Sequence, residues 1–146
     1  MRRFQFRLDP ALRLARFRLD QAQLELAAAQ RTLADEMERR SQLLDQIRSH
    51  QARRADAQKR RLEIQLLLEA AEFENELFER LTDQEKRIQD AAATADLKTE
   101  AAHKCHAECE ALERLRERRK SEHFQEALAA EQKTLDDHSV TRWRRV

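Results

Sequence analysis

The residues best suited to chemistry lie in the segment His103-Lys-Cys105-His106-Ala-Glu-Cys109. On a helix, Cys105, His106 and Cys109 fall within about 100° of arc, so three soft ligands could converge on Zn²⁺. Structural zinc sites usually draw ligands from two elements, however, and the sequence places no Cys or His opposite this segment. We therefore interpret the cysteines as small residues of a helix interface and the histidines as solvated, and we expect no metal and no other cofactor.

The carboxylates are not arranged for catalysis. They are spread along the chain with basic residues three or four positions away, which is the spacing of solvated ion pairs on helices. No nucleophile-and-base constellation occurs. Because the chain has no Gly, the P-loop and Rossmann fingerprints are excluded. We expect no enzymatic activity.

The composition indicates which elements carry these residues. Of the 146 residues, 39% are charged, 40% hydrophobic and 5% aromatic, with one Pro and a mean hydropathy of −0.92. Such values are typical of long helices and coiled coils, and a chain without Gly cannot easily form tight β-turns. At this length we expect a single, all-α domain.

Charge and apolar runs exclude further classes. The 29 basic residues balance 28 acidic ones, so the net charge of +1 gives no reason to expect nucleic-acid binding. No apolar run is long enough for a signal peptide or a membrane span, and two cysteines suit a reducing compartment. The sequence therefore predicts a soluble, cytoplasmic protein without direct membrane insertion.

Helical periodicity is the strongest signal. Apolar residues recur at alternating steps of three and four, with two polar interruptions, at Leu12, Ala15, Leu19, Ala22, Leu26, Ala29, Leu33, Glu36, Arg40, Leu43 and Ile47. Residues 48–61 contain no large apolar side chain. The stripe resumes at Leu66, Ala70, Phe73, Leu77, Leu81, Ile88, Ala91, Ala95, Ala102, Cys105, Cys109 and Leu112.

Folding the chain back near residue 60 pairs the two stripes. Leu12 then faces Cys109 and Leu26 faces Ala95, so large residues meet small ones as close antiparallel packing requires. This register predicts an antiparallel two-helix coiled-coil hairpin with an overhanging C-terminal helical arm. The expected parts are an extended basic arm 1–9, a helix 10–52, a turn region 53–64, a helix 65–140 that overhangs from 113, and a basic tail 141–146.

Two surfaces are candidates for partner contacts. In the overhang, Phe124, Leu128 and Leu135 have no predicted partner from the first helix, so their apolar surface is available to another protein. Nearer the turn, Phe73, Leu77 and Leu81 fit the helix interface, whereas Phe78 must point elsewhere, which indicates a contact. The alternative is that these four residues cap the interface near the turn.

Three segments resemble the FliJ family of the bacterial flagellar export apparatus. They are the start FQFRLDPALRLARFRLDQAQLELAAA, the middle LEAAEFENELFERL and the end ALERLRERRKSEHFQEALAAEQKTLDDHSVTRWR. The most distinctive motif of the end is Glu131-Gln132-Lys133-x-Leu135-Asp136. Asp137 departs from the family, whose members often carry Glu there.

The resemblance implies a stalk protein that inserts into the hexameric export ATPase, promotes its assembly and activity, and links it to the membrane export gate. It also implies binding of export chaperones and a peripheral position at the cytoplasmic face of the inner membrane. The implied ATPase contact comprises Phe124, Leu128, Gln132, Lys133, Leu135, Asp136, Arg142 and Trp143. The implied gate contact comprises Phe73, Leu77, Phe78 and Leu81.

Electrostatic steering of the ATPase contact is expected from Arg3, Arg7, Arg142, Arg144 and Arg145. Lys133 and Asp136 are expected beside the apolar face. Two alternatives stay open. One is the related injectisome stalk protein of virulence-type secretion systems, and the other is a generic coiled-coil tether or scaffold, which would need no specific sequence at 124–137.

Overall fold

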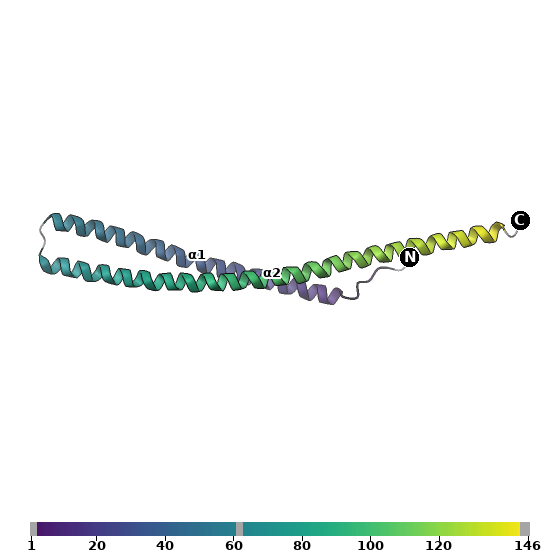
Figure 1. The fold of residues 1–146 in the computed structure, drawn as a ribbon, viewed down its shortest axis with the longest axis horizontal. Helices are drawn as coiled ribbons and strands as arrows, with labels where there is room; N and C mark the ends of the chain where they lie inside the picture. The colour runs from purple at the N-terminus through teal and green to yellow at the C-terminus, as the bar shows by residue number, and fades with distance from the viewer. Residues whose placement is uncertain (1–2, 61–62, 144–146) are drawn as a thin grey trace. The chain divides into compact units, whose positions relative to one another are not determined.

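The computed structural model describes residues 3–60 and 63–143, and the regular structure in these ranges is entirely helical. Two long helices, α1 (Asp9–Lys59) and α2 (Ile64–Trp143), are in close contact (Figure 1). The contacts divide the chain into two compact units. We call residues 22–102 the connecting unit, and residues 3–21 with 103–143 the terminal unit.

The helices are longer than the sequence predicted. Helix α1 ends at Lys59 rather than at residue 52, and α2 begins at Ile64 and ends at Trp143 rather than at residue 140. Residues 48–60 lack an apolar stripe, but their Ala, Arg, Gln and Lys have high helix propensity, so the helix continues there. Residues 61–62 of the expected turn and residues 144–146 of the expected tail lie outside the described residues.

Within the connecting unit the two helices run antiparallel and lie side by side (Figure 1). Lys98 Nζ pairs with Glu25 Oε2 at 2.8 Å, and Arg40 Nη1 pairs with Glu85 Oε1 at 3.4 Å. Residue numbers rise on α1 as they fall on α2, which is the direction that the hairpin prediction requires. The apolar core of this unit consists of Ala22, Ala29, Ile47, Leu77, Ile88 and Ala95.

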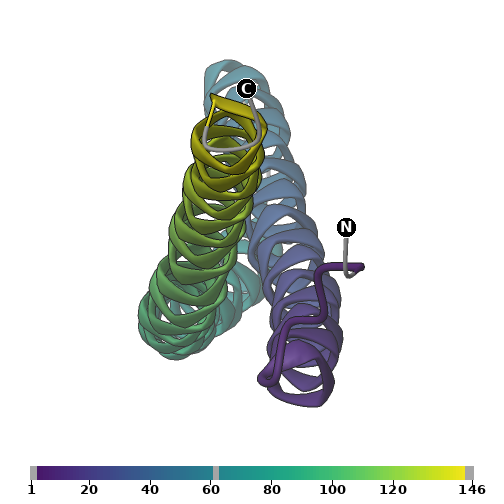
Figure 2. The ribbon, with the colours of Figure 1, turned by 90° about the vertical axis from the view of Figure 1, so that its right-hand side faces the viewer.

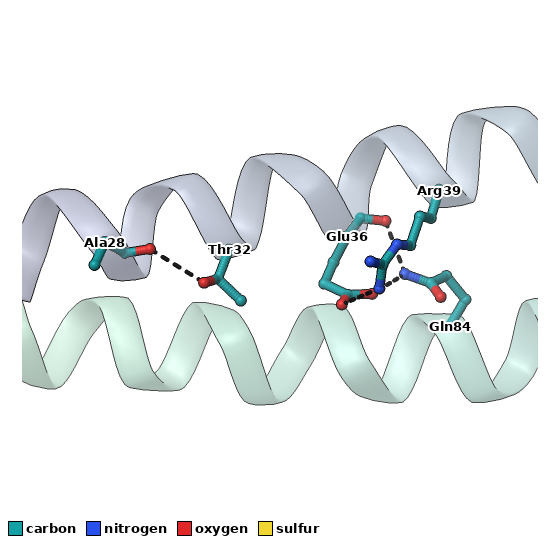
Figure 3. A network of polar contacts seen from close by, with 5 residues as sticks. All are labelled: Ala28, Thr32, Glu36, Arg39 and Gln84. Carbon is teal, nitrogen blue, oxygen red and sulfur yellow. Dashed lines mark hydrogen bonds and ion pairs between the residues drawn. The ribbon is translucent and has the colours of Figure 1, made fainter.

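A polar layer interrupts this core. Gln84 is only 5% exposed, and its Nε2 donates to the main-chain oxygen of Glu36 at 2.8 Å and also to the Glu36 carboxylate. The same carboxylate accepts a hydrogen bond from Arg39 Nη1 at 2.9 Å (Figure 3). The buried amide is therefore satisfied by a residue of the opposite helix. The apolar period of α2 did not identify Gln84, because a polar residue carries no apolar signal.

The core of the terminal unit confirms one predicted pairing. Leu12, fully buried, packs with Ala15 and Cys109, and Leu19 and Leu112 cover this cluster. Leu12 thus faces Cys109 as the register predicted. At the edge of the same unit, the guanidinium of Arg16 donates from Nε and Nη2 to Glu113 Oε1, at 3.2 and 3.1 Å.

The segment preceding α1 packs against α2, which the sequence did not predict. Residues 3–8 are not helical (Figure 2). Phe6 packs on the Leu12 cluster, and the ring of Phe4 lies 5.6 Å from that of His123 at an interplanar angle of 59°. Leu115, Arg116, Glu122 and His123 are half-buried, so the part of α2 that was expected to overhang from 113 is partly covered. Only from 128 to 143 is every residue exposed.

Two predicted core residues lie at the surface. Leu66 and Phe73 are each nearly half exposed. The physical reason lies in the opposite helix, since residues 48–59 of α1 offer no large apolar side chain against which they could pack.

Candidate functional site

An exposed apolar face runs along the C-terminal part of α2. Phe124, Leu128 and Leu135 are 53%, 48% and 69% exposed. At 3.6 residues per turn these positions fall within about 40° of arc, and Arg142 falls in the same sector. The described chain therefore carries three apolar side chains on one side of α2, with Glu131 about 40° from their centre and between Leu128 and Leu135 along the chain. We call Phe124, Leu128, Leu135 and Arg142 the arm face.

The other residues expected at this surface surround the arm face unevenly. Gln132 and Trp143 lie about 60–80° from its centre, and Asp136 lies about 100° away. Lys133 lies about 160° away, so it points to the opposite side of the helix and not beside the apolar face as expected. Leu135, His138 and Trp143 line an open hollow of about 670 Å³.

The start of the chain adds exposed bases to the same unit. Arg3 and Arg7 are exposed on the non-helical segment and line an open groove of about 600 Å³ with Phe4 and Leu115. Arg144 and Arg145, the other two bases expected to steer a partner, lie outside the described residues.

The four residues expected at the gate contact do not form one patch. Leu77 is 0% exposed, so its side chain offers no surface, and Leu81 is half-buried. Phe73 and Phe78 are 45% and 43% exposed. Five positions separate them, which corresponds to about 140° around the helix, so they flank the buried Leu77 on opposite edges.

The edge that carries Phe73 is tied to α1 by polar contacts. Gln51 Nε2 donates to Glu74 Oε1 at 3.2 Å, and Arg54 donates to Glu74 Oε2. These two hydrogen bonds hold the pKa of the Glu74 carboxyl below its ordinary value, and the positive charge of Arg54 adds to the effect. His50 contacts two residues of α2 that precede Glu74. Its Nε2 lies 2.9 Å from the main-chain oxygen of Ala70, and its ring packs against that of Phe73. The sequence did not single out His50, since a lone histidine on a polar stretch carries no pattern.

The candidate zinc ligands do not form a ligand set. Cys109 is buried, Cys105 is half-buried, and His106 is exposed with its Nδ1 4.0 Å from Glu110. Burial raises the pKa of the Cys109 thiol, and the negative charge of Glu113 adds to the rise. Within residues 3–60 and 63–143, no three His, Cys, Asp or Glu side chains are placed to hold a metal ion.

The described residues thus present contact surfaces rather than an enclosed site. In the part of the chain that the structure describes, no helix is long and apolar enough to cross a membrane.

The family model described as flagellar FliJ protein matches residues 4–146, which is nearly the whole chain. No curated protein matches the sequence, and no solved structure matches it.

Proposed function

Because the chain belongs to the FliJ family, which forms a structural component of the flagellar export apparatus, we propose that it is the stalk protein of that apparatus. The family serves flagellum biogenesis and type III protein export. The family match therefore favours a flagellar stalk over the injectisome stalk and over a generic tether. In the proposed role the chain has no catalytic activity of its own.

The proposed stalk is an antiparallel coiled coil whose C-terminal part inserts into the hexameric export ATPase and promotes its assembly and activity. The arm face is the observation that supports this role. Phe124, Leu128 and Leu135 stay exposed although they share one side of a helix, and covering the exposed half or more of each against a partner is worth about 1–2 kcal/mol. Arg142 lies on the same side and contributes the base that steers an acidic partner.

The surrounding residues have graded roles in this contact. Gln132 and Trp143 flank the arm face closely enough to touch the same partner. Asp136 and Lys133 lie farther around the helix, so they reach only a partner that encloses it, as the pore of a hexameric ring would. Arg3 and Arg7 add long-range attraction, which makes association sensitive to salt.

The second proposed contact joins the stalk to the membrane export gate through Phe73 and Phe78. Aromatic side chains that are half exposed on a thin helical pair are typical anchors of protein interfaces. Leu77 and Leu81 support this contact indirectly, because they pack in the interface that holds α2 against α1. Binding of export chaperones and a position at the cytoplasmic face of the inner membrane complete the proposal.

The ATPase contact is tested with the double variant Leu128→Ser/Leu135→Ser in the full chain. We expect helicity and thermal melting to be preserved, since both leucines are exposed, while stimulation of the purified export ATPase falls at least tenfold. The matched control is Leu24→Ser/Leu97→Ser, which replaces two leucines that are 66% and 67% exposed in the connecting unit.

The control should stimulate the ATPase as the unmodified chain does. Equal stimulation by the arm-face variant would place the ATPase contact elsewhere. If neither the unmodified chain nor any variant binds the ATPase, the chain is not the stalk, and the tether becomes the better explanation.

A further inference from the structure

Phe73 contacts His50, which lies in the last, largely polar part of α1. From residue 48 to Lys59, α1 carries no large aliphatic side chain, and His50 is its only aromatic residue in that range. The His50 ring centroid lies 5.0 Å from that of Phe73 at an interplanar angle of 66°, and Phe73 keeps 45% of its surface exposed.

The imidazole of His50 is itself held in place. Its Nε2 lies 2.9 Å from the main-chain oxygen of Ala70, and because a carbonyl oxygen only accepts, Nε2 must carry the proton and donate. Ala70 lies one turn before Phe73 on α2, so the hydrogen bond fixes the ring at the height of the phenyl group. The orientation of the His50 ring is thus set before any partner arrives.

Neighbouring hydrogen bonds also join the two helices at this point. Gln51 and Arg54 of α1 both donate to Glu74, the residue after Phe73. Together with the His50 contacts they tie three residues of one helix to three residues of the other. The edge-to-face geometry is favourable for aromatic pairs, so the contact with His50 favours one orientation of the Phe73 ring.

We propose that His50 is a positioning residue that holds Phe73 in the orientation in which it contacts the export gate. The proposal rests on the proposed function, in which Phe73 is part of the gate contact. A side chain whose rotamer is fixed in advance loses less entropy on binding, so His50 raises affinity without touching the partner. The hydrogen bond to Ala70 and the ring contact with Phe73 are separate features, and they can be removed separately.

The test uses three variants of the full chain. His50→Ala removes both features, His50→Phe keeps an aromatic ring without the donor, and His50→Gln keeps a donor without the ring. The phenylalanines are replaced by 4-fluorophenylalanine, and the ¹⁹F resonance of Phe73 is assigned by its loss in Phe73→Leu. Phe78, on the opposite edge of α2, is the internal control. Affinity is measured for the purified export gate protein.

We expect His50→Ala to move the Phe73 resonance toward its position in the unfolded chain, to leave that of Phe78 unchanged, and to weaken gate binding about tenfold. His50→Phe should restore much of the resonance shift and of the affinity, whereas His50→Gln should restore neither. If His50→Gln binds the gate protein as tightly as the unmodified chain does, the proposal is contradicted, because the ring would then be dispensable.

Failure of this proposal and failure of the proposed function give different results. If Phe73→Ala weakens gate binding but His50→Ala does not, the gate contact stands and His50 does not position it. If Phe73→Ala leaves gate binding unchanged, Phe73 is not part of the gate contact, and both proposals are wrong for this edge. An unchanged Phe73 resonance in His50→Ala overturns the positioning role whatever the affinity.

Discussion

Two stretches of the same helix carry large apolar residues at helical spacing and bury them very differently. In the connecting unit, Leu77 and Ile88 of α2 are buried against α1. In the terminal unit, Leu128 and Leu135 of α2 are exposed, and every residue from 128 to 143 is exposed. Helical spacing thus determines which side of a helix is apolar, but the presence of a partner segment determines whether that side is buried. The exposed stretch is where we expect a protein partner to replace the missing helix.

The largest expected effect is the difference in the free energy of unfolding between substitutions in these two stretches. Leu77→Ala should destabilise the protein by about 2–5 kcal/mol, because it leaves a cavity at a fully buried position. Leu135→Ala should change stability by no more than about 0.5 kcal/mol, since the side chain is 69% exposed. Urea denaturation followed by circular dichroism measures both. A comparable loss in Leu135→Ala would mean that the C-terminal stretch already packs against something in solution.

The second prediction concerns the polar layer within the buried stretch. Gln84→Leu should change the stability by less than about 1 kcal/mol, because burial of an additional apolar side chain is offset by loss of the donor to one oxygen of the Glu36 carboxylate, whose other oxygen still pairs with Arg39. The substitution should make the register less unique. After a slip by one heptad, Gln84 would face Ala29 or Leu43, which offer a main-chain oxygen but no carboxylate, so the native glutamine disfavours the slip.

Register is measured by electron–electron distances between spin labels at Glu38→Cys and Asp96→Cys, in a chain with both native cysteines replaced by Ala. A slip of one heptad moves the labels by about 10 Å along the axis. We expect a single distance in the parent, and in Gln84→Leu that distance together with a second one from the slipped register. The exposed Gln89→Leu is the control and should show the parent distance alone. A single unchanged distance in Gln84→Leu would show that other contacts fix the register.

The periodicity of the sequence predicted much of this arrangement. On α1, all predicted interface positions from Leu12 to Ile47 are buried or half-buried, because steps of three and four keep side chains on one side of a helix. The pattern failed where a polar residue replaces an apolar one or an apolar residue lacks a partner. Gln84 is buried because Glu36 supplies a carbonyl and a carboxylate, and Phe73 is exposed because α1 opposite it is polar.

The sequence predicted less of the candidate contact surfaces than of the helix interface. The face formed by Phe124, Leu128 and Leu135 followed from spacing, and the structure keeps it exposed. The packing of Phe4 on His123 could not be foreseen, because the segment before Asp9 has no period that relates it to a position on α2. Contacts of non-helical segments depend on the path of the chain, which short motifs do not encode.

The third prediction concerns the effect of pH on the hydrogen bonds between Glu74 and α1. Because the pKa of Glu74 is lowered in the folded chain, its ionised form contributes stability above the ordinary value of 4.5, and this contribution is lost as the pH falls below it. We expect Glu74→Gln to melt at a lower temperature than the parent at pH 7, and the difference should shrink as the pH is lowered from 5 to 3. A difference that stays constant over this range would rule out the ionised pair as its source.

The smallest expected effect is on thiol reactivity. Burial of Cys109 and the raised pKa of its thiol both slow alkylation, since the thiolate is the reactive form. With iodoacetamide at pH 8, Cys105 should be modified several times faster than Cys109 in the folded chain, as followed by mass spectrometry of peptides. In urea the two rates should converge. Faster modification of Cys109 under native conditions would show that the Leu12 cluster opens readily.

The hydrogen bond between Gln84 and the carboxylate of Glu36 also constrains how the gene can change in length. It ties one position of α1 to one position of α2, so residues inserted or deleted between Glu36 and the connection must be matched by an equal change between the connection and Gln84. An unmatched change of seven residues would keep the apolar stripe facing inward but would separate the amide from the Glu36 carboxylate. Changes in length outside residues 36–84 leave this hydrogen bond in place.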